Sequence, residues 1–303
     1  RADKFTGAAH FTVQCGCSHF EEGTKAPQLP VVALVFNFPA SNSSQMPLLT
    51  LGDLTTFFHE FGHALHSVLS QTTYQHLSGT RGPLDFVEVP SHLFEAFTTD
   101  IRCLQRWARH YVSGKSPPAG MLEEALAARR SFEALEASSQ VLYSLVDQHI
   151  FGTRMGSVAG MSNEQAYSQA VSAALALQTE HTALSAAPMQ NSIGQTSPYV
   201  RRMAADLGIP GEQWHPAVYL PSHSHFVTYG GGYYAYLYAK MCAAQIWTTH
   251  FAEDPLSRAS GERLWRNMLG YGVSRPPKVI LKDVLGGVLN PKHYYRAIGA
   301  AEK

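Results

Sequence analysis

The chain begins with two segments whose hydrophobic pattern predicts β-strands. Residues 9–15 alternate between hydrophobic and polar side chains and are rich in strand formers. Residues 30–38 (PVVALVFNF) form a continuous apolar run with several β-branched residues, which is typical of a buried strand. The connection between the two segments contains Gly, Pro, Glu and Lys, and a loop rich in Ser, Asn and Pro follows at 39–47. This part of the chain therefore predicts a small β-sheet.

From residue 50 onward the pattern becomes helical. Thr50 and Asp53 have the spacing of a capping box, which predicts a helix that continues to about Ser70. Asp254 and Asn290 each precede a proline, and this order predicts two further helix starts. Loops are expected at 152–162 and 185–199, and helices at 85 or 90 to 114, 120–151, 162–184, 199–207 and 232–250. We find no internal repeat, and we expect a mainly α fold with a small β-sheet near the N-terminus.

Composition narrows the class of protein. A length of 303 residues, 45% of them hydrophobic, allows one large domain or two of ordinary size. Because 23 basic residues balance 23 acidic ones, the charge argues against nucleic acid or an anionic membrane surface as partners. The apolar runs are all far shorter than the roughly 18 residues of a membrane-spanning helix, so we expect no membrane insertion. Four cysteines do not form a disulfide scaffold, which favours a reducing compartment.

The predicted helix that starts near Thr50 contains the motif HExxH, formed by His59, Glu60 and His63. Residues four apart share one face of a helix, so both imidazoles can bind the same ion. Glu60 is close enough along the helix to reach a water molecule on that ion and take its proton. The flanking residues are largely apolar, which indicates a buried helix, and a buried carboxylate without an ion would be uncompensated. The motif predicts a zincin-type hydrolase with one divalent ion; zinc, manganese and cobalt all suit such ligands.

A catalytic zinc site needs a third protein ligand. The candidates are Asp85, Glu88 and Glu95, which share one face if this segment is helical. Carboxylates that do not bind the ion can accept hydrogen bonds from the ligand histidines, and the alternative for Glu95 is a charge on the helix surface. His66 lies seven residues after His59, one turn beyond the pair, and is interpreted as a packing or hydrogen-bonding residue.

A second unusual segment covers residues 223–236 and contains three adjacent glycines followed by tyrosines. Tyr233 and Tyr236 are three residues apart and share a helix face. A phenol can donate a hydrogen bond to a developing oxyanion. The alternative interpretation is that these tyrosines only pack the start of a helix. The three glycines do not have the spacing of a nucleotide-binding loop.

Three of these segments together resemble the thimet oligopeptidase family of zinc peptidases. They are FHEFGHALH at 58–66, SGT at 78–80 and DFVEVPS at 85–91. YQH at 74–76, GTR at 79–81 and the opening RADK are most similar to the mitochondrial intermediate peptidase branch of that family.

The resemblance implies a function for most of the residues named above. It implies that His59, His63 and Glu88 bind one zinc ion and that Glu60 is the general base. It also implies that four further residues line the site, with the tyrosines assisting in transition-state stabilisation: His225, Tyr229, Tyr233 and Tyr236.

The resemblance covers residues 1–155 and about 213–272, so we interpret 156–212 as an insertion. Members of the family have a longer chain, whose first half forms a helical N-terminal lobe. We therefore expect residues 1–303 to be the catalytic lobe, a piece that starts without Met and shows no targeting signal. The resemblance implies an endopeptidase that removes a short N-terminal peptide from imported precursor proteins in the mitochondrial matrix. The alternatives are a general, cytoplasmic oligopeptidase of the same family and a catalytically silent peptide-binding fragment.

Overall fold

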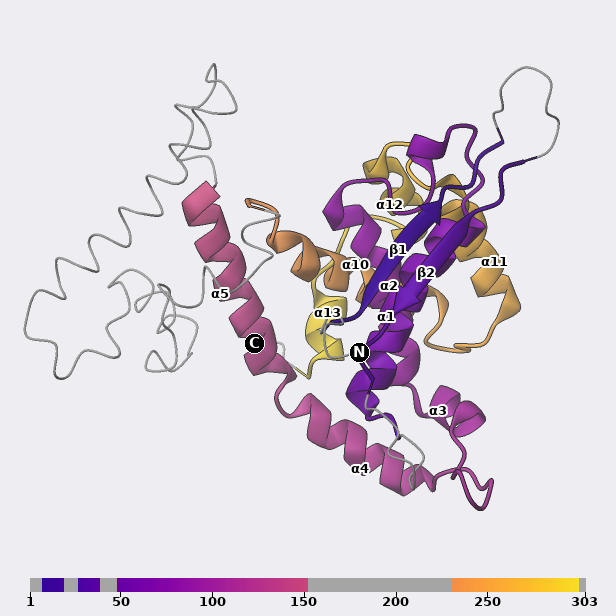
Figure 1. Ribbon diagram of the computed structural model, residues 1–303. Helices are drawn as coiled ribbons and strands as arrows, with labels where there is room; N and C mark the ends of the chain where they lie inside the picture. Colours follow the sequence, from indigo (N-terminus) through magenta and orange to yellow (C-terminus); the bar gives the residue numbers. More distant parts are fainter. Residues whose placement is uncertain (1–6, 19–26, 39–47, 152–229, 300–303) are drawn as a thin grey trace, which may run out of the picture. The chain divides into compact units, whose positions relative to one another are not determined.

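The computed structural model describes residues 7–18, 27–38, 48–151 and 230–299. Contacts between Cα atoms divide the chain into two units, and each unit is described by itself. The first unit contains Arg1–Ser131 and Tyr238–Lys303, and the second contains Phe132–Leu237. Helices dominate the described residues, as Figure 1 shows, so the predicted mainly α fold is confirmed.

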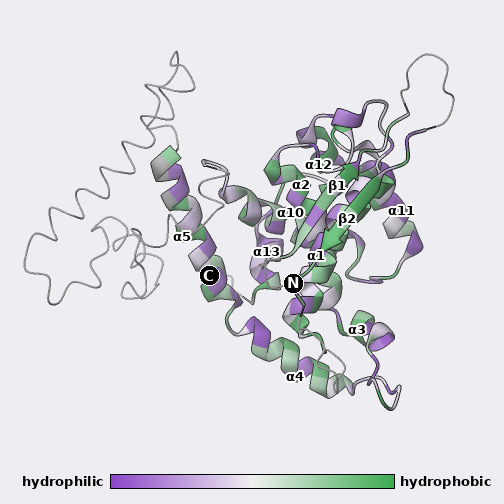
Figure 2. Cartoon of the chain, in the orientation of Figure 1, coloured by the Kyte–Doolittle hydropathy of each residue, from purple (hydrophilic) through white to green (hydrophobic). Residues whose placement is uncertain are grey.

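The predicted sheet is present in the first unit. Strands β1 (Ala9–Gln14) and β2 (Val31–Val35) pair antiparallel, with His10 opposite Leu34. Strand β2 is hydrophobic along its length, whereas hydrophobic and polar residues alternate along β1 (Figure 2). The sheet lies along the first helix, α1 (Leu51–Leu69), as Figure 1 shows.

Helix α1 packs closely against α2 (Leu84–Glu95). The capping box is confirmed: the Thr50 side chain accepts from the Asp53 amide, and the Asp53 side chain accepts from the Thr50 amide. Gly62 permits the close approach of the helices, because a Cβ atom there would lie 2.7 Å from Ser91 Cα. The glycine inside the HExxH motif therefore sets the spacing between α1 and α2.

A large hydrophobic core joins α2 to helices from the C-terminal third of the first unit. Its fully buried members include Phe86 and Leu93 of α2, together with Ile246, Met268 and Ile280. The other helices of the described residues, in both units, are α3 (Ile101–Trp107), α4 (Ala119–Arg130), α5 (Glu133–Phe151), α10 (Tyr234–His250), α11 (Arg258–Asn267), α12 (Pro277–Leu285) and α13 (Lys292–Ala297).

The prediction of one helix that continues to residue 114 is wrong, because α2 ends at Glu95. A 3₁₀ turn, Ala96–Thr98, follows, and the Thr98 hydroxyl donates to the Glu95 carbonyl at 2.7 Å. Asp100 then caps α3 by accepting from the Arg102 amide at 2.9 Å. Side chains that bond to nearby backbone groups interrupt the helix here.

The prediction of a single helix over 120–151 is also wrong, because this segment forms two helices, α4 and α5. Ser131 ends α4, and its hydroxyl donates back to the Ala127 carbonyl at 3.1 Å. The boundary between the two units falls directly after this residue.

Two predicted helix starts lie close to the observed ones. Asp254 does not cap a helix; it forms a turn by accepting from the Leu256 amide at 3.1 Å, and Ser257 caps α11 instead. Asn290 accepts from the Lys292 amide at 3.1 Å, at the start of α13. Helix α12 was not predicted, although Pro277 stands at its first position.

Several predictions fall outside the described residues. They are the loops at 39–47, 152–162 and 185–199, the helices at 162–184 and 199–207, and the insertion at 156–212. Among the helices that the structure does describe, none combines the length and the apolar character that a bilayer crossing needs.

Candidate metal centre

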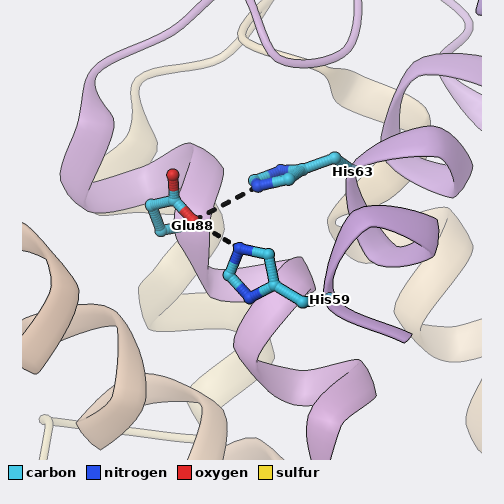
Figure 3. A group of neighbouring side chains, drawn as sticks. All are labelled: His59, His63 and Glu88. Carbon is cyan, nitrogen blue, oxygen red and sulfur yellow. Dashed lines mark ion pairs between the residues drawn. The ribbon is translucent and has the colours of Figure 1, made fainter. Parts of the chain in front are cut away.

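Two imidazoles from α1 and one carboxylate from α2 converge in the first unit (Figure 3). The Nε2 atoms of His59 and His63 lie 3.4 and 3.3 Å from one oxygen, Oε2, of Glu88. The two histidine rings stand nearly perpendicular, at 84°, with centroids 5.0 Å apart. All three side chains are largely buried, with 20%, 12% and 10% of their surface exposed, respectively. The structure thus brings together the three residues that the family resemblance implies as ligands.

The spacing of these atoms fits a metal ion better than direct hydrogen bonds. A charge-assisted hydrogen bond between nitrogen and carboxylate oxygen is about 2.7–2.9 Å long. Ligands at about 2.0–2.1 Å from a tetrahedral zinc ion are separated by roughly 3.3–3.4 Å. Two nitrogens and one oxygen are also a donor set that zinc accepts, whereas calcium and magnesium prefer oxygen alone. The donors present therefore fit one zinc ion.

Glu88 is held as an ionised carboxylate. Burial alone would raise its pKa, but the facing imidazoles of His59 and His63 hold the pKa well below its usual value. Ser91, one turn further along α2, donates its hydroxyl to the same Oε2 at 2.9 Å. This hydrogen bond orients the oxygen that faces the two histidines.

The other ring nitrogen of His59 faces α2. Its Nδ1 lies 2.6 Å from Oε1 of Glu95, and Nδ1 of His92 lies 2.9 Å from the same oxygen. Although burial would lower the pKa of His59, the neighbouring carboxylates of Glu88 and Glu95 raise it to about 10. Both distances are those of hydrogen bonds and are shorter than the edge of a zinc tetrahedron. The cluster of His59, His92 and Glu95 is therefore a hydrogen-bond network beside the candidate metal centre.

Glu60 has the environment expected of a carboxylate that exchanges protons. It is 8% exposed, and burial raises its pKa above the usual value, opposed by the charges of His59 and His63. The backbone of His10 on β1 also hydrogen-bonds to this carboxylate. A raised pKa makes a carboxylate a stronger proton acceptor.

Glu95, rather than Asp85, is the hydrogen-bond partner of the outer ring nitrogen of His59. His59 Nδ1 bonds to Glu95, and His63 Nδ1 is buried with no hydrogen-bond partner among the residues described. Burial, with a smaller contribution from Asp85, raises the pKa of the Cys242 thiol to about 12, which places Asp85 near α10. His66 is fully buried and packs edge-on against Phe86, with ring centroids 5.8 Å apart.

The tyrosines belong to the second unit, where they lie at the start of α10. The rings of Tyr233 and Tyr236 pack edge to face with centroids 5.6 Å apart, so they share a face as predicted. The Tyr233 hydroxyl donates to Oε1 of Gln140 at 3.1 Å. Asp147 on α5 accepts from the amides of Gly231 and Tyr233, at 3.0 and 2.9 Å. His225 and Tyr229 lie outside the described residues.

One known protein family matches almost the whole chain. The sequence profile of peptidase family M3 matches residues 1–300. The chain belongs to peptidase family M3. Members of family M3 are in general zinc metallopeptidases.

Relatives within family M3 include mitochondrial intermediate peptidases from distant organisms. The chain is 37% identical over 286 residues to the enzyme of Arabidopsis thaliana, covering 94% of this chain and 35% of that protein. It is 35% identical to the human enzyme, covering 94% of this chain and 34% of that protein. Mitochondrial intermediate peptidase 2 of Cryptococcus neoformans is 31% identical over 95% of this chain and 36% of its own length. The chain thus spans about a third of the length of the relatives that it matches.

Two residues of this M3 chain were missed by the sequence analysis. His92 follows Glu88 by four positions and precedes Glu95 by three, so helical periodicity could have placed it on the same face. His10 lies on β1, with its ring centroid 5.9 Å from that of His63 and its Nε2 atom 3.2 Å from the Ser67 hydroxyl. Burial and His63 lower the pKa of His10 to about 4. Its proximity arises from packing between the sheet and α1, for which the sequence carries no local signal.

Proposed function

We propose that residues 1–303 form the catalytic lobe of a zinc-dependent endopeptidase. The observation that carries the proposal is the convergence of two imidazole nitrogens on the Glu88 carboxylate, at 3.4 and 3.3 Å from one of its oxygens, with Glu60 next in sequence to His59. Membership of family M3 supports the same class of reaction.

In this proposal His59, His63 and Glu88 hold one zinc ion, and Glu60 moves the protons. When bound, zinc supplies a Lewis acid that lowers the pKa of water to about 7 and polarises a carbonyl. Glu60 takes a proton from the attacking water and returns it to the leaving amine as the peptide bond breaks. Its raised pKa fits both steps, because the carboxylate must accept a proton readily and release it again.

The tyrosines stabilise negative charge in the same proposal. The hydroxyl of Tyr236 or Tyr233 donates to the carbonyl oxygen of the scissile bond as charge develops there. The Tyr233 hydroxyl donates to Gln140 in the structure, so its use in catalysis requires an exchange of hydrogen-bond partner. His225 and Tyr229 line the same site in this proposal.

The names of the relatives suggest the substrate and compartment. We propose that the protein removes a short N-terminal peptide from imported precursor proteins in the mitochondrial matrix. Since the chain spans about a third of these relatives, we also propose that an N-terminal lobe completes the substrate channel. The alternatives are a general oligopeptidase and a catalytically silent fragment that binds peptides.

The test uses the protein expressed from its complete reading frame. Hydrolysis of a quenched fluorescent peptide should disappear when a chelator removes the metal and return when one equivalent of zinc is added. Preferential cleavage of precursors that have already been cut once supports precursor processing, whereas equal cleavage of unrelated short peptides favours the general oligopeptidase. Binding of peptides without hydrolysis, at full zinc occupancy, would support the silent alternative and contradict the proposal.

A further inference from the structure

We propose that His92 is a positioning residue of the metal centre, which holds the Glu95 carboxylate so that Glu95 fixes the ring of His59. The inference rests on the proposed function, because it takes His59 as a metal ligand. It concerns a residue outside the HExxH motif and outside the proposed ligand set.

The geometry shows two donors on one acceptor. His59 Nδ1 and His92 Nδ1 lie 2.6 and 2.9 Å from the same Oε1 atom of Glu95. The two histidine rings meet edge to face, with centroids 5.0 Å apart at 71°. His92 is buried, at 9% exposure, so solvent does not compete strongly for its hydrogen bond.

These contacts determine which nitrogen of His59 carries the proton. An ionised carboxylate only accepts hydrogen bonds, so Nδ1 of His59 must be the donor to Glu95. The lone pair of a neutral His59 is then on Nε2, the atom that faces Glu88 at 3.4 Å. Glu95 therefore holds His59 in the tautomer that a metal ligand needs.

His92 supplies the second constraint on this carboxylate. A carboxylate with a single donor can turn about its terminal torsion, whereas two donors converging on Oε1 fix its direction. The backbone of Glu95 is held separately, because its carbonyl accepts from Thr98 at 2.7 Å and the Thr98 hydroxyl contacts that of Thr55 at 3.0 Å. Arg129 of α4 donates to the same Thr55 hydroxyl at 2.9 Å.

The environment of the other ring nitrogen of His92 indicates that histidine is needed here for its Nδ1 hydrogen bond to Glu95. Its Nε2 is buried and has no hydrogen-bond partner among the residues described. An apolar residue would fill this position without leaving a polar atom unsatisfied, so the hydrogen bond to Glu95 is the interaction that requires histidine here. A second metal ion between these residues would need longer separations than the 2.6 and 2.9 Å observed.

A matched pair of variants tests the role of the Nδ1 donor. The amide nitrogen of asparagine can occupy the place of His92 Nδ1, whereas leucine has nearly the same shape as asparagine and no donor. In the protein expressed from its complete reading frame, His92→Leu should weaken zinc binding about 10- to 100-fold, and His92→Asn should restore most of it. Zinc affinity is measured by competition with a chromophoric chelator. The visible spectrum of the cobalt-substituted protein should change in His92→Leu and return in His92→Asn.

Three results would overturn the inference. The first is that His92→Leu binds zinc as tightly as the wild type. The second is that His92→Leu and His92→Asn lose the same amount of zinc affinity. The third is that the wild type binds two equivalents of zinc and His92→Leu binds only one. Where His92→Leu fails to fold, His92→Phe replaces it, because it keeps a ring and removes the donor. Failure of the proposed function can be distinguished from failure of this inference. If the proposed metal ligands are wrong, His63→Ala will bind zinc as tightly as the wild type.

Discussion

Replacing Gly62 by alanine tests whether the close packing of α1 and α2 sets the metal centre. The added Cβ atom would lie 2.7 Å from Ser91 Cα and 2.8 Å from the Pro90 carbonyl oxygen. Both neighbours are backbone atoms, which cannot turn aside as a flexible side chain can. To reach ordinary contact the two helices must separate locally by about 0.7 Å. Overpacking of this kind destabilises a fold by about 1–3 kcal/mol.

The same displacement acts on the candidate ligands. His63 follows Gly62 directly on α1, and Glu88 lies on α2 across the contact. A shift of about 0.7 Å between the helices exceeds the tolerance of about 0.2 Å in a metal–ligand bond. We therefore expect Gly62→Ala to lower zinc affinity about tenfold or more, in addition to its effect on stability.

The assay combines urea unfolding of the metal-free protein with chelator competition for zinc. The matched control is Gly261→Ala on α11, where an added Cβ atom meets nothing within 4 Å. This control should leave zinc affinity unchanged and stabilise the fold by about 0.5–1 kcal/mol, because alanine is the better helix former. A Gly62→Ala variant with wild-type stability and wild-type zinc affinity would refute the reasoning.

Three further predictions concern the proposed roles of single residues. Glu60→Gln should keep zinc and stability while lowering peptide hydrolysis about 10²- to 10⁴-fold, and more than about a tenth of the activity remaining would remove Glu60 from the role of general base. Glu88→Ala should lose stoichiometric zinc and Asp85→Ala should keep it, as measured by metal analysis after dialysis; the opposite result would change the ligand assignment. Since the pKa of metal-free His59 is raised to about 10, at neutral pH its ring carries a second proton, on Nε2, which zinc must displace. Zinc affinity should therefore rise about tenfold per pH unit between about pH 6 and 8, and a flat profile would contradict that protonation state.

The parts of the fold that were predictable are those with local signals. The capping box of Thr50 and Asp53 marks the start of α1, and the β-branched run after Pro30 marks β2. The breaks after Glu95 and at Ser131 were missed, because hydrophobic periodicity continues across both positions. Hydroxyl and carboxylate side chains that bond to the backbone divide these helices, and such bonds depend on the conformation that they stabilise.

The residues of the candidate site also divide into those that local spacing predicts and those that only packing between helices distinguishes. Helical spacing alone places His59 and His63 on one face, but it leaves Asp85, Glu88 and Glu95 equivalent as partners. The contact between α1 and α2 distinguishes them, because Glu88 faces both imidazoles and Glu95 reaches only the far nitrogen of His59. That contact is a property of packing between segments, so periodicity within one segment could not supply it.

We propose that His59, His63 and Glu88 together hold one zinc ion. Diffraction from crystals of the zinc-loaded protein, measured on both sides of the zinc absorption edge, tests it directly. We predict one anomalous peak per chain, about 2.0–2.2 Å from Nε2 of both histidines and from a carboxylate oxygen of Glu88. A peak coordinated by other residues, or no peak at full zinc loading, would contradict it.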